Sequence, residues 1–201
     1  MSNYEINLSN RKFVEHEFNG SVFNGSVLNG LVFNESKFNK SEFNNSKFYE
    51  SEFNWSRSYC SEFNKSKFYS SKFYNSKFKW SKFENSVFND SMFNDSKLND
   101  SVFNNSEFYS SKFYKARFKW SKFENSVFNG SVLVKSEFNW SKLYGSEFNE
   151  CKLSAVKFTS SDLSGCSFSG CTFENVELTQ KQIDSLKTPL TEEQLKGVIL
   201  I

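Results

Sequence analysis

The sequence predicts an all-β solenoid of stacked square coils that ends in a short helical cap. Phenylalanine occurs only at positions whose number leaves remainder 3 on division by five, from Phe13 through Phe173. A small residue, usually serine, precedes most of these phenylalanines by two positions. The register runs from Leu8 to Leu178 without an insertion, whereas residues 179–201 have a helical pattern.

A period of five is neither the 3.6 of a helix nor the 2 of a strand, so each unit must contain a short strand and a turn. In one unit, Ser81 and Phe83 face inward, Lys82 faces solvent, and Glu84 and Asn85 turn the chain. Four units close a square coil of twenty residues. The next coil stacks on it through parallel backbone hydrogen bonds at roughly 4.8 Å.

This unit of a small residue, any residue and Phe resembles the repeat of the pentapeptide-repeat family, whose members fold as right-handed quadrilateral β-helices. The resemblance covers about residues 6 to 178, or thirty-five units. It implies a right-handed quadrilateral parallel β-helix of about nine coils over residues 1–178. Residues 179–201, which lie beyond the repeat, are expected to form a helical C-terminal cap. The family favours Asp or Asn before the Phe, but this chain has Lys, Glu or Val there. Because that position faces solvent, the departure concerns the choice of partner and not the fold.

The segment FKWSKFENSVFN occurs at residues 78–89 and again at 118–129. Two coils of twenty residues separate the copies, so both lie on the same faces, about 9.6 Å apart along the axis. The extended copies, residues 68–89 and 108–129, differ only at Asn75/Lys115, Ser76/Ala116 and Lys77/Arg117. Duplication of a two-coil block is sufficient to explain the copy. The alternative is that the copied surface itself has a function.

The phenylalanines are predicted to stack coil upon coil, with serine behind them, which leaves no internal ligand pocket and no tunnel. One unit departs from the pattern. Ser58 occupies a Phe position between Phe38 and Phe78 on the same face. We expect a void there, a water molecule, or Tyr59 turned inward.

The first coil is irregular at its inward positions, which hold Ile6, Arg11 and His16. His16 is therefore interpreted as a terminal-coil residue and not a catalytic one.

Beyond Leu178, two short helices are expected. Their start signals are two capping boxes, and Pro189 separates them, while Gly197 can end the second. The two boxes pair Thr179 with Gln182 and Thr191 with Gln194. These helices would cover the open end of the sheets, which would otherwise invite edge-to-edge growth.

The resemblance also implies, at the level of the fold, that the C-terminal module can mediate a homodimer. The candidate dimer contacts are Leu195, Val198, Ile199, Leu200 and Ile201.

The sequence contains no set of residues that is typical of a catalytic, phosphate-binding or metal-binding site. With one histidine, no Ser-His-Asp or Cys-His set can form without His16, and no phosphate-binding glycine loop or metal-binding cluster occurs. Asp90, Asp95 and Asp100 fall five residues apart, so they lie on three successive corners and cannot act as a carboxylate pair. The expectation is a protein that is not an enzyme and that uses no cofactor and no metal.

The cysteines lack a CxxC pair or a nearby histidine and are interpreted as buried small thiols plus one at the surface. They are Cys60, Cys151, Cys166 and Cys171.

One candidate interaction face is indicated by Trp80, Trp120 and Trp140, whose numbers differ by multiples of twenty. The flanking cations are Lys77, Lys79, Lys82, Arg117, Lys119 and Lys122. Aromatic rings among cations suit a single-stranded nucleic acid or another polyanion. The alternative is a solvated corner, with lysine stems lying across the rings and Glu84 and Glu124 offsetting the charge.

The net charge of the chain helps to indicate which kind of partner it binds. The formal net charge is +2, and residues 1–178 contain 22 basic and 20 acidic residues. The resemblance raises the possibility of a DNA mimic that binds DNA gyrase or another topoisomerase, as the quinolone-resistance members do. However, B-DNA carries one negative charge per roughly 1.7 Å, so a mimic about 40 Å long would present on the order of twenty unbalanced negatives. The interrupting loops of those members are also missing from the uninterrupted register.

The function predicted from sequence is therefore a non-catalytic, cytoplasmic scaffold for an unidentified protein partner. No leader pattern opens the chain, and no run of eighteen apolar residues suggests a membrane span. The alternatives are the DNA-mimicking gyrase or topoisomerase binder and a polyanion or nucleic-acid binder that uses the Trp/Lys face. The near balance of charge argues against nucleic acid as a partner without excluding it.

Overall fold

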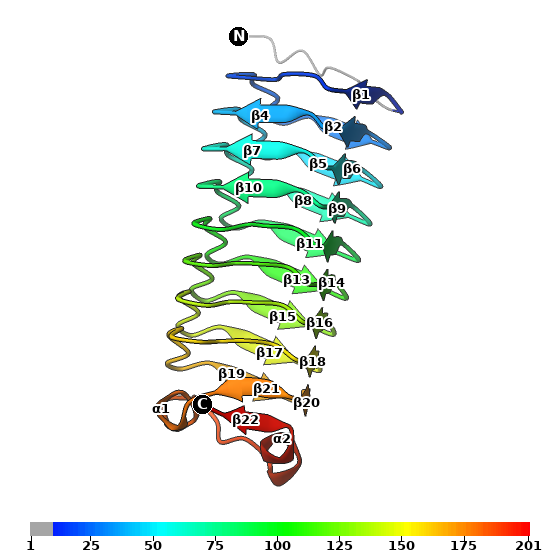
Figure 1. Cartoon of the computed structure of the whole chain (residues 1–201). Coiled ribbons are helices and arrows are strands. Elements are labelled where there is room, and N and C mark those ends of the chain that lie inside the picture. Colours follow the sequence, from blue (N-terminus) through cyan, green and yellow to red (C-terminus); the bar gives the residue numbers. More distant parts are fainter. Residues whose placement is uncertain (1–9) are drawn as a thin grey trace.

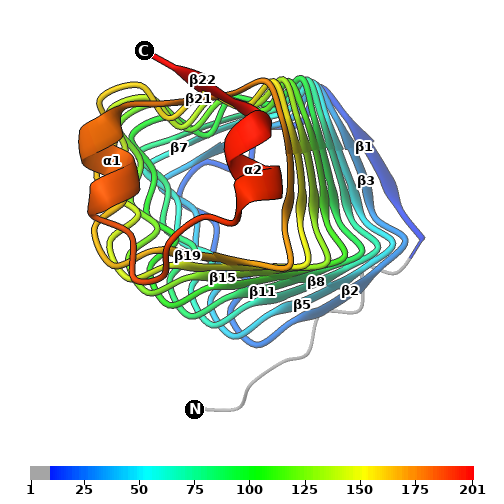
Figure 2. The same ribbon diagram turned by 90° about the horizontal axis from the view of Figure 1, so that it is seen from below.

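The computed structural model describes residues 10–201, so the expectations on Ile6 and Leu8 lie outside the described residues. The chain winds as a right-handed quadrilateral parallel β-helix, and its coils rise along one axis from β1 to the two helices near the C-terminus (Figure 1). Seen along that axis, each coil is nearly square (Figure 2). The expected fold class is confirmed.

The four sides of the square are described here as four faces, in the order in which the chain visits them. The first face is an eight-stranded parallel sheet. Its strands are β2 (Val27–Asn29), β5 (Lys47–Tyr49), β8 (Lys67–Tyr69), β11 (Val87–Asn89), β13 (Glu107–Tyr109), β15 (Val127–Asn129), β17 (Glu147–Asn149) and β19 (Ser167–Ser169).

The second face is a nine-stranded parallel sheet. Its strands are β1 (Lys12–Val14), β3 (Val32–Asn34), β6 (Glu52–Asn54), β9 (Lys72–Tyr74), β12 (Met92–Asn94), β14 (Lys112–Tyr114), β16 (Val132–Val134), β18 (Lys152–Ser154) and β20 (Thr172–Glu174).

The third face begins with a three-stranded sheet of β4 (Lys37–Asn39), β7 (Arg57–Tyr59) and β10 (Lys77–Lys79). It continues through single parallel bridges, such as Lys77 to Lys97, and reaches β21 (Val176–Leu178). The fourth face is joined by such bridges, for example Glu62 to Lys82. Every pair within the coils joins residues twenty apart, which is the register that the sequence predicts.

Each coil turns at residues whose numbers are multiples of five. These residues have a left-handed backbone, as at Asn85 (φ 55°) and Gly130 (φ 58°). At some corners the serine that follows donates its N–H to the carbonyl of the preceding inward residue, as in Ser106 to Phe103 (3.1 Å). Positive φ at the third residue of such a turn suits Gly, Asn and Asp, which explains their frequency there.

The interior is filled by phenylalanine rings stacked along the axis. Every Phe from Phe33 to Phe158 has an exposed fraction of at most 2%. Rings one coil apart stack nearly parallel, with centroids 4.6 Å apart for Phe48 and Phe68 and 5.5 Å for Phe13 and Phe33 at the first coil. Burial of each ring contributes about 1.5–3 kcal/mol of transfer free energy relative to exposure, so stability comes from contacts between neighbouring coils.

The inward serines form ladders of hydrogen bonds. The hydroxyl of Ser86 donates to the carbonyl of Phe63 (2.7 Å) and accepts from the N–H of Ser66 (3.1 Å). Three cysteines continue these ladders: their thiols donate to the carbonyls 23 residues earlier, at 3.0–3.2 Å. They are Cys151, Cys166 and Cys171, which are buried, whereas Cys60 is exposed. The interpretation of the cysteines is confirmed.

Ser58 stands between Phe38 and Phe78 in the parallel register, as predicted. It is buried, and its hydroxyl donates to the carbonyl of Phe38 (3.1 Å). Tyr59 remains half-exposed on the outside, so the suggestion that it turns inward is wrong. Instead, the rings of Phe53 and Phe63 lie 6.5 Å apart across the place that a phenylalanine ring would occupy if the repeat were regular here.

Two short helices cover the C-terminal end of the coils, α1 (Gln180–Asp184) and α2 (Glu192–Lys196) (Figure 2). Both capping boxes are present, at Thr179 and Thr191. The buried amide of Gln194 donates to the carbonyls of Phe168 (2.6 Å) and Cys171 (3.1 Å). The helices thus satisfy backbone groups that a further coil would otherwise bond.

In α1, the side-chain amide of Gln182 satisfies backbone groups in the same way, because it donates to the carbonyls of Phe158 (2.7 Å) and Ser161 (2.9 Å).

The apolar tail is a strand and not a free extension. β22 (Val198–Leu200) pairs in parallel with β21 and adds one more rung to the third face. Gly197 precedes it as the C-cap of α2, and a Cβ there would lie 2.1 Å from the carbonyl oxygen of Phe173. The close approach of the two backbones therefore requires glycine. Ile199, Leu200 and Ile201 remain about half exposed.

No helix within residues 10–201 is both long enough and apolar enough to cross a membrane.

Candidate functional site

The three tryptophans of the predicted face lie on the corner between the third and fourth faces. Trp120 and Trp140 occupy adjacent coils, and their rings stack with centroids 5.7 Å apart and planes 28° apart. Trp80 lies two coils before Trp120, and the intervening corner residue is Asp100. The exposed fractions of the three side chains are 46–54%. The structure therefore brings two of the rings together and leaves the third separate.

Two lysines lie over these rings. The ammonium of Lys79 is 4.0 Å from the ring centroid of Trp80, and Asp100 is 3.9 Å from the same ammonium. Lys119 lies over both Trp120 and Trp140, at 4.2 and 4.3 Å. These are cation–π contacts at an exposed corner, each worth on the order of 0.5–1 kcal/mol. The geometry matches the solvated-corner arrangement in which lysine side chains cross the rings, and it also concentrates positive charge beside aromatic surface.

The remaining predicted cations lie on both sides of the corner. Lys77 and Arg117 belong to the outward row of the third face, while Lys82 and Lys122 belong to that of the fourth. Lys82 is bonded to Glu62 at 2.9 Å, and this hydrogen bond raises the lysine pKa and lowers the glutamate pKa. The predicted set therefore surrounds a corner instead of forming a single flat face.

Acidic neighbours neutralise part of this set. Arg117 lies 3.9 Å from Glu137. Within residues 10–201, no carboxylate comes within 4.0 Å of Lys77, Lys119 or Lys122, and Glu84 and Glu124 form no ion pair.

Sequence reasoning missed residues that complete the third face. Arg57 and Lys97 flank Lys77 directly in the outward row. Trp55 lies on the other corner of the same face, where its ring meets Tyr74 edge-on at 5.9 Å. The sequence contains the information needed to find both cations, because Arg57 and Lys97 lie twenty residues before and after Lys77.

The grooves on this face are open and polar. One groove of about 470 Å³ follows the corner between the second and third faces. It is lined by Asn75, Asp95, Lys97, Lys115, Arg117, Lys135, Glu137, Ala155 and Lys157. Five of these side chains are cationic and two are acidic, so the groove favours an anion.

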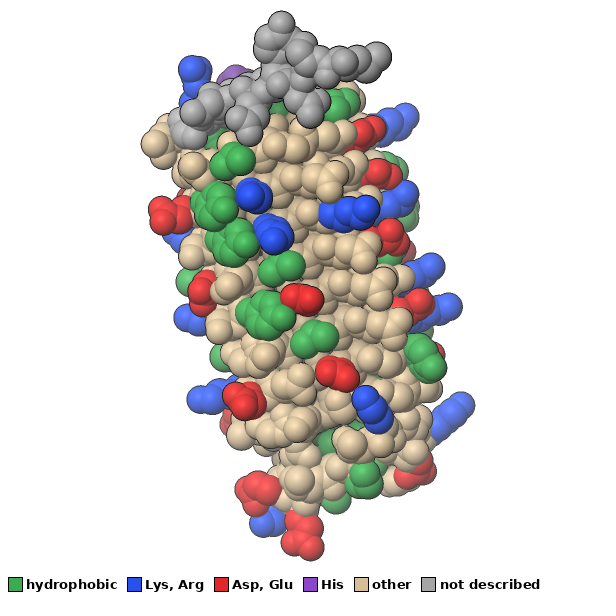
Figure 3. All heavy atoms as spheres, turned by 180° about the vertical axis from the view of Figure 1, so that it is seen from behind, with side chains coloured by type: hydrophobic (Ala, Val, Ile, Leu, Met, Phe, Trp, Pro, Cys, Tyr) green, Lys and Arg blue, Asp and Glu red, His purple; other side chains and the backbone are tan. Residues whose placement is uncertain are grey.

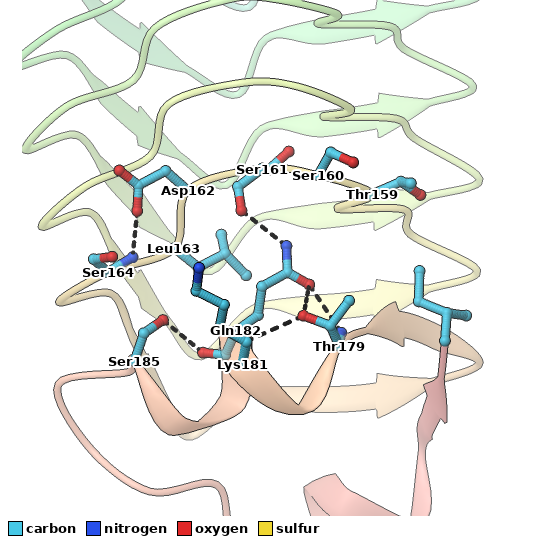
Figure 4. Close-up of a pocket in the computed structure, with 11 residues that line it drawn as sticks. Thr159, Ser160, Ser161, Asp162, Leu163, Ser164, Thr179, Lys181, Gln182 and Ser185 are labelled. Carbon is cyan, nitrogen blue, oxygen red and sulfur yellow. Dashed lines mark hydrogen bonds between the residues drawn. The ribbon is translucent and has the colours of Figure 1, made fainter.

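Another groove lies where α1 docks on the last coils (Figure 4). Its polar groups bond to one another: Gln182 bonds to Ser161 and Thr179, and Asp162 accepts the N–H of Ser164 at 3.0 Å. The hydrogen bonds from Ser164 hold the pKa of Asp162 below its usual value. The arrangement seals the cap and presents no acid–base pair.

The residues that the sequence excluded from catalysis lie as expected. Asp90, Asp95 and Asp100 have φ between 50° and 56°, which places them on successive corners. His16 is exposed in the first coil, where its Nδ1 lies 2.8 Å from the carbonyl of Val14. Among residues 10–201, no group of three or more His, Cys, Asp or Glu side chains could hold a metal ion.

Comparison with known proteins identifies the repeat. Residues 96–178 match the family model described as Pentapeptide repeat region. No curated protein sequence matches the chain. HetL, a pentapeptide repeat protein involved in heterocyst differentiation regulation from the cyanobacterium Nostoc sp. strain PCC 7120, is 14% identical; the match covers 98% of this chain and 92% of HetL, with a TM-score of 0.48.

A trypsin-treated form of QnrB1, a plasmid-mediated fluoroquinolone resistance protein, is 15% identical. That match covers 95% of this chain and 92% of QnrB1, with a TM-score of 0.42. Similarity at this level transfers no function. Residues 96–178 thus carry a pentapeptide repeat region, and the five-residue register and the square coils extend from it toward the N-terminus.

Proposed function

We propose that this protein is a non-catalytic scaffold whose outer rows of side chains bind a protein partner. The observation that carries the proposal is the division between interior and surface. Among the described residues, the interior consists mainly of stacked Phe rings and bonded serines, whereas the outward residues of the inner coils project from a backbone that is hydrogen-bonded to the coil on each side. Such a lattice presents side chains at a spacing of about 4.8 Å without further ordering.

One coil offers a matched test of this proposal. It carries a lysine at the outward position of each of the four faces, Lys67, Lys72, Lys77 and Lys82. Each lysine is replaced separately by a photo-crosslinking amino acid, and the four proteins are irradiated in cells. A scaffold with a defined partner crosslinks to the same species from one or two adjacent faces. Equal labelling from all four faces, or from none, would contradict a specific surface.

The scaffold is further proposed to form a homodimer through its C-terminal end. The support is the exposed apolar edge of β22, where the exposed fractions of Ile199 and Leu200 are 45% and 61%. An unpaired strand edge with apolar side chains is a template for pairing with another chain. Light scattering should give twice the chain mass of 23.5 kDa, and Leu200→Lys should return it to the single mass. A single mass for the parent protein would refute the dimer.

Deleting residues 190–201 is a less clean test, because Gln194 and β22 also close the last coil.

The DNA-mimic alternative has less support. A surface that mimics DNA requires a continuous excess of negative charge, whereas the third face has a run of cations in its outward row. A cytoplasmic location is proposed because all four cysteines are free thiols, as is usual in a reducing compartment.

A further inference from the structure

The third face carries a row of five consecutive cations, which we call the basic row. It consists of Lys37, Arg57, Lys77, Lys97 and Arg117, one per coil, paired in parallel register. Four intervals of roughly 4.8 Å make it about 19 Å long. Within residues 10–201, no other row places more than two charges of one sign in succession. The row therefore departs from the charge pattern of the rest of the surface.

At several places on the surface an acid and a base one coil apart form an ion pair. Examples are Lys72 with Glu52 at 2.7 Å and Lys157 with Glu177 at 2.8 Å. The ends of the basic row are paired in the same way. Lys37 is bonded to Glu17 at 2.6 Å, and Arg117 lies 3.9 Å from Glu137.

The middle of the row has no such partner. Among the described residues, no carboxylate lies within 4.0 Å of Arg57, Lys77 or Lys97. Glu15 and Glu35 line one groove together with Arg57, and Asp95 and Glu137 line another together with Lys97. Like charges opposite one another on neighbouring strands oppose folding. An external anion is therefore the group that would complete this surface.

Aromatic residues border the same row on both corners. Residues 55–60, 75–80, 95–100, 115–120 and 135–140, here called the basic face, contain all four tryptophans of the chain. Trp55 lies on one corner, and the other three lie on the opposite corner, each 46–57% exposed. All four have φ of 54–57°, a backbone region that glycine and asparagine adopt more readily. Trp side chains therefore occupy corner positions that neither core packing nor backbone preference explains.

The charge of the basic face differs from that of the whole chain. It contains eight basic and three acidic residues, a net charge of +5, while the whole chain is +2. The rest of the molecule is accordingly net negative, and the overall balance hides the segregation. The opposite side, the first face, mixes both signs with apolar and neutral side chains (Figure 3). Its outward row reads Val27, Lys47, Lys67, Val87, Glu107, Val127, Glu147 and Ser167.

We propose that the basic face binds a single-stranded nucleic acid that runs along the solenoid axis. The phosphates lie along Arg57, Lys77 and Lys97, and unpaired bases stack on the corner tryptophans. Lys119, which lies over two Trp rings, supplies a cation where backbone and base meet. A duplex would satisfy the cations but leave the rings unused, because its bases are already stacked. This inference goes beyond the proposed scaffold function by naming the face and the class of ligand.

The test uses two double variants with equal net charge. Lys77→Glu with Lys97→Glu changes the basic row, and Lys47→Glu with Lys67→Glu makes the same change at equivalent outward positions of adjacent coils on the opposite face. The probe is a fluorescein-labelled twelve-nucleotide oligothymidylate, followed by fluorescence anisotropy at several salt concentrations. The competitors are a DNA hairpin duplex and inorganic polyphosphate.

The parent protein is expected to bind the oligonucleotide with a slope of log affinity against log salt of about −3, which corresponds to four or five phosphate contacts. The basic-row variant should bind at least tenfold more weakly, with a slope shallower by about 1.4, while the opposite-face variant changes less than threefold. Equal loss in the two variants, or no binding by the parent, would overturn the proposal.

A second measurement separates base stacking from charge alone. Because all four tryptophans border the basic face, their fluorescence should be quenched by the oligonucleotide and not by polyphosphate. Trp120→Asn places a residue common at these corners and should weaken oligonucleotide binding several-fold without changing the salt slope. Equal affinity for the duplex, or equal quenching by polyphosphate, would show a general anion surface and refute single-strand recognition. Thermal melting by circular dichroism verifies that each variant is folded.

If the oligonucleotide does not bind the basic face, the scaffold proposal still stands, because the crosslinking test detects a protein partner on any face.

Discussion

Replacement of Ser58 by phenylalanine tests the principle that phenylalanine stacking determines stability. Ser58 is the inward residue between Phe38 and Phe78, and both of its neighbours along the axis are fully buried rings. A phenylalanine there would restore the column of the third face. Burial of its ring contributes about 1.5–3 kcal/mol. Loss of the hydroxyl bond to Phe38 costs about 0.5–1.5 kcal/mol.

Two features of the structure adjust this balance. The carbonyl of Phe38 keeps the hydroxyl of Ser61 as a partner, so no acceptor is orphaned. However, Phe53 and Phe63 have approached each other to 6.5 Å and must separate for a new ring. The expected net gain is about 1 kcal/mol or less, which corresponds to a rise in Tm of zero to about 4 °C for a chain of this size.

Thermal unfolding followed by calorimetry measures the change, with Ser58→Ala and Ser61→Phe as controls. Ser58→Ala removes the hydroxyl without filling the site and should lower Tm slightly. Ser61→Phe forces a ring into a serine ladder and should lower Tm by several degrees. A clear fall in Tm for Ser58→Phe would refute the reasoning, because it would show that the neighbouring rings already fill the position.

Three further outcomes follow from the ladders and pairs. In the native protein, a thiol reagent should modify Cys60 alone, because the other three thiols are buried. Burial raises the pKa of Cys166 to about 12. More than one reactive thiol before unfolding would contradict the inward ladder. Gln194→Ala should destabilise the cap by about 1–3 kcal/mol in denaturant unfolding and speed amide exchange in the last coils, unlike Gln180→Ala, whose side chain is exposed on α1. The lysine hydrogen bond lowers the pKa of Glu62 below 4.5, so its stabilisation is present above pH 4.5 and is lost as the pH falls through the lower folded value. Glu62→Gln should remove that part of the pH dependence, worth less than about 1 kcal/mol, and identical acid titrations would exclude the pair.

The sequence was sufficient for the coils because each unit repeats one local solution. A residue such as Phe83 has a fixed position in the unit, in the coil and in the stack, so register, facing and burial all follow from its number. The same arithmetic located the Ser58 irregularity, and the spacing of Thr and Gln three residues apart located both capping boxes. Long-range topology, which is usually hidden from sequence, is here a local period.

The parts that could not be predicted depend on contacts outside the repeat. β22 forms because Gly197 lets the chain return against the carbonyl of Phe173, and no periodicity signals that approach. The orientation of Tyr59 depends on how Phe53 and Phe63 repack around a missing ring.

The extent of the basic face was missed for another reason. The predicted face was centred on the tryptophan corner and therefore grouped Lys77 with Lys82, although these two lysines lie on different faces of the square coil. Arg57 and Lys97 belong with Lys77, because residues twenty apart are the true neighbours.

One measurement tests most directly the claim that surface charge, and not a DNA-like shape, decides what this rod binds. The purified protein is titrated into a DNA gyrase supercoiling reaction, with and without a quinolone, beside a gel shift with a single-stranded oligonucleotide. The account predicts unchanged supercoiling, no protection from the drug, and a shift of the oligonucleotide that weakens with salt. Gyrase inhibition or drug protection without any shift would contradict it, because shape alone would then suffice without the negative charge of DNA.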